Sequence, residues 1–351
     1  MPTHLPRRLI LLTPLAALGL AACTDTSTPV VTSNAAVPAS TTPTPTPAPV
    51  LWPLTGEPVT GNAARAQHPS VAVKVDNLLE ARPQWNLDKA DIVYEELVEG
   101  GISRYVAIFH SDIPKVVGPV RSIRPMDPKI ISPFGGIVVY SGGQQKYINW
   151  MEATKVVNVN DEAPDADLFF RITERIAPHN YMMQAAELVK RHKKLAPPPQ
   201  QYSYSDSVTT ASAVTDGVAT TTISEIFGAY ANSKWTWSAD DNGYLRSQQG
   251  AADTQEGGKR VKATNVVILR VHEGFHADVE YGDVPEALLV GRTGPAWYST
   301  GGKTLKGTWS KKKILDPIVF SDVNGAEVKL APGNTWIELV PLTGSFTKSK
   351  S

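Results

Sequence analysis

Short runs of β-branched and aromatic residues recur along the chain from residue 70 onward, and pairs of glycines separate several of them. The run "SVAVKV" predicts a strand. The segment "ADIVYEELVEGGISRYVAIFHS" predicts two strands joined at Gly100 and Gly101, because glycine adopts the positive φ angles that tight turns need. A helix over residues 88–98 is the alternative for the first of these two strands. The runs "GGIVVYSGG" and "KVVNVN" predict two more strands.

Two segments between or after these strands have helical character. The segment "QQKYINWMEA" is compatible with a helix, and "NYMMQAAELVKRHKKL" has an amphipathic pattern that opens at Asn180. The second segment ends in basic residues, which stabilise a helix C-terminus. Strands that alternate with helices predict an α/β domain, with a mixed sheet and flanking helices, over residues 51–195.

The second half of the chain follows a different pattern. Residues 196–222 are rich in Ser, Thr and Pro and predict a flexible linker between domains. Residues 223–343 contain short β runs and an Asn-Gly hairpin signal in "VNGAE", so they predict a mostly β domain, with a tail at 344–351. Five of the eight tryptophans fall in this domain. We expect them in its core rather than in a sugar-binding surface, because large aromatics dominate the cores of small β domains.

The N-terminus predicts export and lipidation. Residues 1–22 contain two arginines, an apolar run too short to span a bilayer, and the tetrapeptide "LAAC" that ends at Cys23 and matches a bacterial lipobox. Residues 23–50 predict a lipidated cysteine and a disordered Thr/Pro-rich tether. An ordinary secretory signal followed by a stray thiol is the alternative. We therefore expect a lipid anchor on Cys23 that holds the protein on the extracytoplasmic side of the cell membrane.

Charge and composition narrow the classes of partner. The chain has 34 basic and 34 acidic residues, a balance that gives no reason to expect a nucleic-acid partner. Cys23 is the single cysteine, so neither an internal disulfide nor a Cys–His nucleophile is available. The chain also lacks the G-x-S-x-G, phosphate-loop and dinucleotide-binding motifs, and we expect no cofactor.

The pentapeptide "HEGFH" at 272–276 fits the zinc-protease motif H-E-x-x-H. That chemistry requires a helix, which places both histidines on one metal ion. Here the motif follows the β run "NVVILRV" and contains Gly274. On a strand, His272 and His276 lie about 13 Å apart, too far to share one zinc ion. We therefore predict no metal site.

The first half contains the candidate site, because polar residues gather there at predicted loops and strand ends, where α/β folds commonly bind ligands. The segment "GPVRSIRP" (118–125) has two arginines and no acid. The candidate ligand-binding residues are Asn77, Arg82, Arg104, Arg121, Ser122, Arg124 and Asn180. The candidate catalytic residues are Asp76, Glu95, Glu99 and His179.

Each of these residues also has a structural alternative. Arg82 and Arg104 could form ion pairs with Asp76 and Glu95, and Asn180 could cap a helix. A strand separates Glu95 from Glu99 by about 13 Å, which argues against a catalytic carboxylate pair. Taken together, the cluster favours a site, since buried charges are costly unless they are paired or used.

The motifs "VKVDN", "ARPQ", "ADIVYEELVEGGISR", "GPVRSIRP", "SGG" and "RIAPHN", followed by "NVVIL" and "GTWSK", resemble the YerB-like lipoprotein family. The resemblance covers nearly all of residues 51–343 and implies paired N- and C-terminal domains of unknown function in a bacterial, membrane-anchored envelope lipoprotein. The candidate residues fall on motif positions. A serine often follows the paired glycines in the family pattern, whereas this chain has Gln144 there.

These observations favour a binding protein over an enzyme. We expect Arg82, Arg121 and Arg124 to hold the carboxylate or phosphate of a peptide, a cell-wall fragment or an envelope partner, because guanidinium groups bind such anions at two points. A cell-wall hydrolase or lyase is one alternative, with Glu95 or Asp76 as acid or base and His179 as proton shuttle. A non-catalytic envelope scaffold is the other.

Overall fold

The computed structural model describes residues 48–278 and 282–350. The predicted signal peptide, Cys23 and the tether up to residue 47 lie outside the described residues. Within these two ranges, no helix is both long and apolar enough to cross a bilayer. From residue 48 onward the chain forms a single unit.

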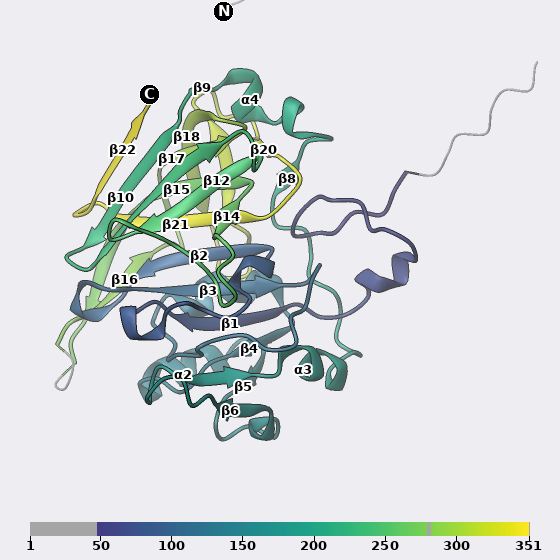
Figure 1. Ribbon diagram of the computed structural model, residues 1–351, viewed down its shortest axis with the longest axis vertical. Coiled ribbons are helices and arrows are strands. Elements are labelled where there is room, and N and C mark those ends of the chain that lie inside the picture. Colours follow the sequence, from purple (N-terminus) through teal and green to yellow (C-terminus); the bar gives the residue numbers. More distant parts are fainter. Residues whose placement is uncertain (1–47, 279–281, 351) are drawn as a thin grey trace, which may run out of the picture. The chain divides into compact units, whose positions relative to one another are not determined.

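The largest sheet contains twelve of the described strands and draws them from both halves of the chain (Figure 1). In spatial order its main path is β19 (Val319–Asp322), β18 (Lys303–Lys311), β17 (Arg292–Thr300), β15 (Asn265–His276), β21 (Thr335–Pro341), β2 (Ile92–Leu97), β3 (Ser103–Phe109), β1 (Val71–Asp76), β4 (Ile137–Val139) and β5 (Val157–Val159). Two further strands join it at β15 and β18, namely β16 (Val284–Leu288) and β9 (Val218–Ala219).

A second sheet belongs to the second half of the chain. Its strands are β13 (Ala251–Ala252), β12 (Gly243–Gln248), β11 (Ala231–Ser238), β10 (Thr222–Gly228) and β22 (Ser345–Ser349), with β14 (Lys262–Ala263) beside β12. Two small ladders pair β6 (Phe169–Arg171) with β7 (Tyr181–Met183) and β8 (Ser203–Tyr204) with β20 (Lys329–Leu330).

The helices of the described residues are short. The α-helices are α1 (Asp127–Ile131), α2 (Gln145–Glu152), α3 (Ala185–Arg191) and α4 (Ser212–Asp216). The 3-10 turns are η1 (Ala63–Ala66), η2 (Leu79–Ala81), η3 (Leu87–Lys89), η4 (Glu99–Gly101), η5 (Ser132–Phe134), η6 (Ala166–Leu168) and η7 (Val208–Thr210). The mixed sheet with few helices in the first half, followed by mainly antiparallel strands, confirms the predicted fold classes.

The central strands of the large sheet are buried on both faces, and their alternate residues enter two different cores. On β1, Ala72 packs into one core, whereas Val71 and Val73 pack into the other. On β2, Ile92 packs into the same core as Ala72, and Val93 packs into the core of Val71 and Val73. A strand covered on both faces reads as a nearly continuous apolar run, which explains the composition of "SVAVKV" and "DIVY".

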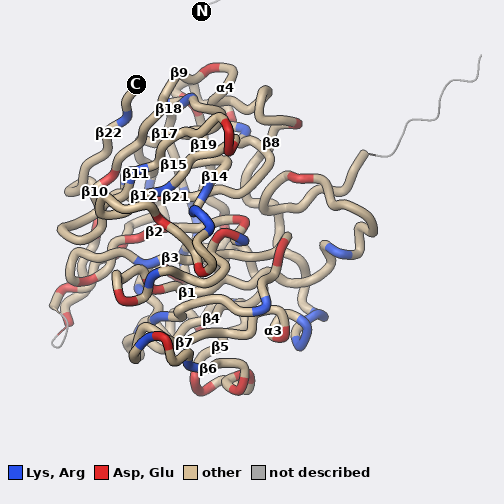
Figure 2. The backbone as a smooth tube through the Cα atoms, viewed as in Figure 1, with Lys and Arg blue, Asp and Glu red and all other residues tan. Residues whose placement is uncertain are grey.

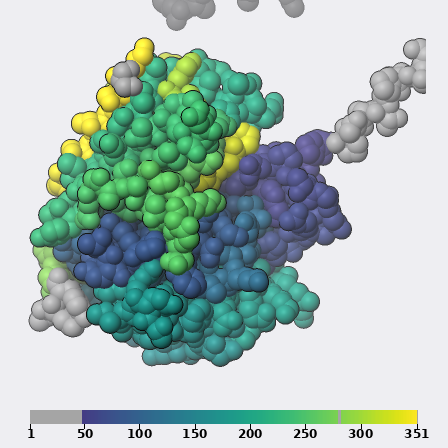
Figure 3. All heavy atoms as spheres, viewed as in Figure 1, coloured from purple at the N-terminus to yellow at the C-terminus, as the bar shows by residue number. Residues whose placement is uncertain are grey.

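The two halves of the chain share the large sheet. β21 lies between β15 and β2 and runs parallel to both, so that Glu338 lies opposite Glu95 on β2. On the face drawn in Figure 3, residues of the two halves adjoin one another. The segment expected to be a linker, 196–222, contains β8, η7, α4 and β9, and the segment expected to be a tail contains β22, which pairs with β10. The halves are therefore continuous at the level of the sheet.

Candidate functional site

Backbone hydrogen bonds hold the segment "GPVRSIRP" between β1 and the glycine loop that precedes α2. The amide of Arg121 donates to the carbonyl oxygen of Lys74 on β1 over 2.8 Å. The amide of Ile123 donates to the carbonyl oxygen of Gly142 over 3.1 Å. These bonds fix the backbone that carries Arg121 and Arg124, which lowers the entropy lost when their side chains bind a partner.

The arginines of this segment line a hollow of about 480 Å³, which we call the arginine cleft. Its walls are contributed by the ends of β1 and β3, by η4, and by the loops before α1 and α2. The lining residues are Leu78, Glu99, Ile102, Arg104, Arg121, Ser122, Arg124, Gly143 and Gln144. Five of the sequence-predicted candidates therefore lie around one hollow.

Gly143 allows the loop before α2 to approach the arginine segment closely. Its φ angle is +153°, and a Cβ atom added there would lie 3.1 Å from Cγ1 of Ile123. A side chain at this position would therefore push the two walls of the arginine cleft apart, and its backbone conformation is one that glycine adopts most readily.

Arg124 and Glu99 form a two-point ion pair at the cleft wall. Nε of Arg124 donates to Oε2 of Glu99 over 2.6 Å, and Nη2 donates to Oε1. Burial alone would raise the pKa of Glu99, but the hydrogen bonds and charge of Arg124 lower it to about 2. The backbone amide of Arg124 also donates to Asp127, which holds the start of α1 against the segment. Arg124 is therefore fixed at both its backbone and its side chain.

Arg104 projects from β3 and is 4% exposed. Its Nη1 donates to the carbonyl oxygen of Ser122 over 3.2 Å, and its Nη2 lies 3.6 Å from Oε1 of Glu99. Its Nε is buried and has no hydrogen-bond partner among the described residues. Burial and then the nearby charge of Arg124 lower the pKa of Arg104 to about 9, so the guanidinium remains charged at neutral pH. The two arginines thus share one carboxylate.

Arg121 is paired from behind by a buried acid. Its Nε lies 3.2 Å from Oδ2 of Asp76, and Nδ1 of His179 lies 2.8 Å from the same oxygen. Asp76 is fully buried, whereas His179 and Arg121 are partly exposed. The carboxylate of Asp76 therefore holds the side chains of Arg121, which lines the arginine cleft, and of His179 beside each other. His179 in the loop "APHN" therefore contacts Asp76 next to the cleft but is not one of the lining residues.

The balance of charge in the arginine cleft is positive. Three guanidinium groups line it, while Glu99 is the one carboxylate among the lining residues. Asp76, which does not line the cleft, offsets the charge of Arg121. Elsewhere along the described chain basic and acidic residues are interspersed (Figure 2). The cleft is therefore a local concentration of cations in a neutral protein.

Arg82 and Asn77 lie outside the arginine cleft. Arg82 donates to the backbone carbonyl of Asn77 over 2.7 Å, and the side chain of Asn77 donates to Ser103 and to Gln248 of β12. These contacts join the first half of the chain to the second sheet. The structure does not bring Arg82 to the cleft beside Arg121, because its guanidinium is directed to Asn77 and Gln249.

Glu95 also lies away from the cleft, in a buried charge cluster. It accepts from Arg246 of β12 and from Ser103, and Arg246 donates to Asp253 over 2.7 Å. Glu225 of β10 belongs to the same cluster. Burial raises the pKa of its carboxyl group to about 8, although the charge of Arg246 opposes this shift. The structure therefore separates Glu95 from His179, and the pair does not form. The partner of Glu95 is distant in sequence, so no local pattern identified Arg246.

Asn180 has a different role from the one predicted. The helix expected to open there begins at Ala185, and residues Tyr181–Met183 form β7 instead. The side chain of Asn180 donates to the carbonyl oxygens of Ile172 and Arg175, each over 2.9 Å. It stabilises the turn between β6 and β7 rather than a helix terminus, and it does not line the arginine cleft.

The histidines of "HEGFH" lie on β15, as predicted. Nε2 of His276 lies 2.6 Å from Oε2 of Glu286 on β16, whereas His272 is exposed. The described residues contain no group of three side chains with the arrangement of a metal site.

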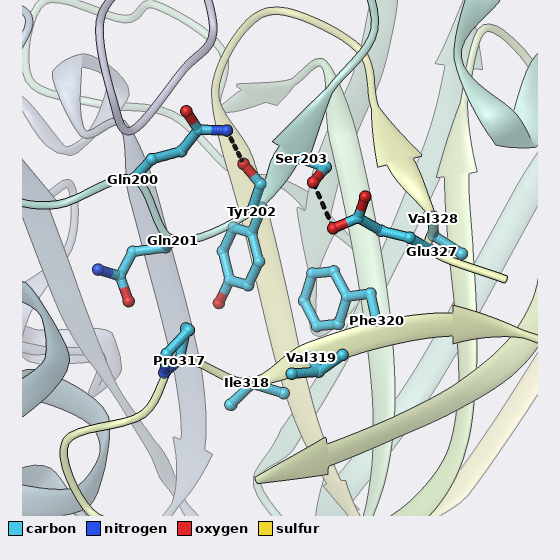
Figure 4. A pocket seen from close by; sticks show the side chains of 10 residues that line it. All are labelled: Gln200, Gln201, Tyr202, Ser203, Pro317, Ile318, Val319, Phe320, Glu327 and Val328. Carbon is cyan, nitrogen blue, oxygen red and sulfur yellow. Dashed lines mark hydrogen bonds between the residues drawn. The ribbon is translucent and has the colours of Figure 1, made fainter. Parts of the chain in front are cut away.

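A second hollow, of about 260 Å³, lies between the segment around Tyr202 and the strand β19 (Figure 4). The rings of Tyr202 and Phe320 stack at 4.4 Å, and Oγ of Ser203 donates to Glu327 over 2.5 Å. It shares no lining residue with the arginine cleft. The segment that contains Tyr202 was expected to be a linker, and no motif in it indicated this hollow.

Another buried group of charges, formed by Lys74, Glu96 and Asp127, contacts the segment that carries the cleft arginines. Nζ of Lys74 donates to Glu96 of β2 and, over 2.9 Å, to Asp127 of α1. Burial, followed by the charge of Asp127, raises the pKa of Glu96 to about 8. Because Asp127 also accepts from the amide of Arg124, this group supports the arginine segment from below. The sequence analysis did not predict this group, although a lysine inside the apolar run "SVAVKV" is a local pattern that could have indicated it.

Comparison with known proteins agrees with the fold. Residues 54–198 match the profile "Protein of unknown function (DUF3048) N-terminal domain", and residues 223–337 match that of the C-terminal domain. The chain is 30% identical over 289 residues to the "Putative lipoprotein YerB" of Bacillus subtilis, covering 80% of this chain and 83% of that protein. The crystal structure of YerB from Bacillus subtilis superposes with a TM-score of 0.71 at 26% identity, covering 85% of this chain and all of that one. The chain therefore belongs to the DUF3048 family of proteins of unknown function and is similar to YerB over most of its length.

Proposed function

We propose that the protein is a membrane-anchored envelope lipoprotein whose arginine cleft binds the anionic group of a peptide, a cell-wall fragment or an envelope partner. The observation that carries the proposal is the meeting of Arg104, Arg121 and Arg124 around one hollow with a single lining carboxylate. Guanidinium groups bind carboxylate and phosphate through two parallel hydrogen bonds, which makes them suited to this task.

The buried and incompletely bonded guanidinium of Arg104 supports an anionic ligand. Its charge is buried and lies near the like charge of Arg124, and within residues 48–278 and 282–350 its Nε has no hydrogen-bond partner. An anion in the cleft would offset this repulsion between the two guanidinium groups. Buried cations without full compensation are costly, so their retention favours a role in binding.

The remaining lining residues indicate what adjoins the anion. Leu78 and Ile102 provide an apolar wall, while the amide of Gln144 offers both a donor and an acceptor. A ligand that combines a carboxylate or phosphate with a small apolar group would use all of these surfaces.

Catalysis is the second candidate, and the Asp76–His179 pair favours it. The contact of 2.8 Å between these side chains, with Arg121 on the same carboxylate, resembles a proton-transfer arrangement beside an anion site. Glu95 does not take part, since it is buried against Arg246. Turnover of wall fragments by the protein, lost in Asp76→Asn, would favour this candidate over binding alone.

The test compares removal of charge inside the arginine cleft with removal of charge outside it. Arg121→Gln with Arg124→Gln should weaken binding of an acylated dipeptide carboxylate at least tenfold, because each charge-assisted hydrogen bond contributes about 1.5–3 kcal/mol. Arg82→Gln removes the same kind of charge outside the cleft and should leave binding unchanged. Affinity would be measured by calorimetry on the full-length protein, with thermal unfolding as the check on folding. Unchanged affinity in a folded double variant, or an equal loss in Arg82→Gln, would contradict the proposal.

A further inference from the structure

An exposed aromatic surface lies beside the arginine cleft. All eight tryptophans fall within the described residues, and of these Trp150 alone is exposed, with 40% of its surface accessible. It projects from α2, the helix that begins directly after the cleft residues Gly143 and Gln144. The tryptophans of the second half are buried or half-buried, so Trp150 calls for a different explanation.

Two routes connect the Trp150 ring to the arginine cleft. The first runs through Tyr147, whose ring centroid lies 5.4 Å from that of Trp150 and whose backbone amide donates to the carbonyl oxygen of the cleft residue Gln144 over 2.8 Å. Through Lys129, Nζ lies 5.2 Å from the centre of the Trp150 ring and donates over 2.8 Å to the carbonyl of Pro125, the residue after Arg124. The aromatic surface and the cleft are therefore neighbours.

Polar groups surround the Trp150 ring. The ring of His276 meets it edge-on at 5.5 Å, and Glu286 accepts from both His276 and Lys129. Tyr147 is fully buried, and its hydroxyl has no hydrogen-bond partner among the described residues. An entirely apolar ligand on the ring would cover Lys129 and Glu286 without offering them a hydrogen bond, which is unfavourable. A ring with both an apolar face and hydroxyl groups can bond to the donors of Lys129 and the carboxylate oxygens of Glu286 that their ion pair leaves available.

We propose that the ligand of the arginine cleft is an acidic sugar, whose pyranose ring packs on Trp150 while its acidic group pairs with Arg124 and Arg104. This inference rests on the proposed anion binding and adds the class of ligand. The C–H face of a pyranose packs on the electron-rich face of an indole ring, and its hydroxyl groups can bond to the surrounding donors and acceptors. Lys129 and Glu286 are placed to make such bonds.

Three small probes separate the sugar from the acid. N-acetylmuramic acid carries both, N-acetylglucosamine carries the same ring without the carboxylate, and lactate carries the acid alone. Glucuronic acid, measured in parallel, distinguishes a wall sugar from acidic polysaccharides of other origin. Each would be titrated into the full-length protein and followed by NMR, together with Trp150→Ala and the control Leu315→Ala, which removes an exposed apolar side chain elsewhere.

We expect Trp150→Ala to weaken N-acetylmuramic acid binding about tenfold and to leave lactate binding unchanged. Trp150→Phe should recover part of the loss, and Leu315→Ala should have no effect. Equal affinity of the parent and a folded Trp150→Ala for both acidic sugars would overturn the inference while anion binding stands. Failure of the parent to bind any of the acids would overturn the proposed function and this inference with it.

Discussion

Replacement of Glu99 by Gln should lower stability and strengthen anion binding at the same time. The pKa of Glu99 falls from its ordinary value of 4.5 to about 2, which corresponds to an upper limit of about 3 kcal/mol in the free energy of unfolding. The side chain is 17% exposed, and solvent screens part of the interaction, so we expect about 1–2 kcal/mol at neutral pH. Arg124 and Arg104, freed from the carboxylate, should bind an added anion more tightly.

The pH dependence has a definite sign. Because the pKa of Glu99 is lower in the folded state than in the unfolded state, its contribution is complete above about pH 4.5 and disappears as the pH falls toward 2. Urea unfolding of the parent and Glu99→Gln at a series of pH values would measure this difference. A constant difference across that range, or weaker anion binding by the variant, would refute the account of the Glu99 ion pairs.

Three further predictions concern other parts of the chain. Arg246→Met leaves the buried Glu95 without its cation and should reduce the free energy of unfolding by about 3–5 kcal/mol; a loss under 1 kcal/mol in urea unfolding would contradict this. Gly143→Ala should be less stable than Gly142→Ala by about 1 kcal/mol. Both positions have positive φ, but an added Cβ meets Ile123 only at position 143, whereas Gly142 faces open space. Equal thermal unfolding of the two variants would exclude the steric contact. Cys23→Ser should move the protein from the membrane fraction to the soluble fraction, and membrane retention would argue against a lipid anchor on this residue.

Local sequence patterns predicted the elements that line the arginine cleft. The two strands around Gly100 and Gly101 are present as β2 and β3, and η4 occupies the turn. The choice of strands over a helix at 88–98 depended on the β-branched and aromatic residues, which pack on a doubly covered sheet. This choice separated Glu95 from Glu99, and the structure places them in different environments.

Partners distant in sequence could not be read from local pattern. Glu95 pairs with Arg246, and Asn77 bonds to Gln248, because the tertiary fold brings side chains of β12 against β2 and the residue that follows β1. Nothing in the spacing of "YEEL" indicates which acid faces a distant arginine. The helix expected at Asn180 failed for a related reason, since β7 pairs with β6 and this tertiary contact outweighs helical propensity.

The position of β21 has a consequence for the order in which the chain can fold. Synthesis releases the chain from its N-terminus, yet the neighbour of β2 in the finished sheet is a strand formed by residues 335–341. Until that strand emerges, β2 presents an open edge in the middle of what becomes the large sheet, and open edges favour association with other chains. The first half therefore completes its part of the large sheet only when synthesis of the chain is almost finished.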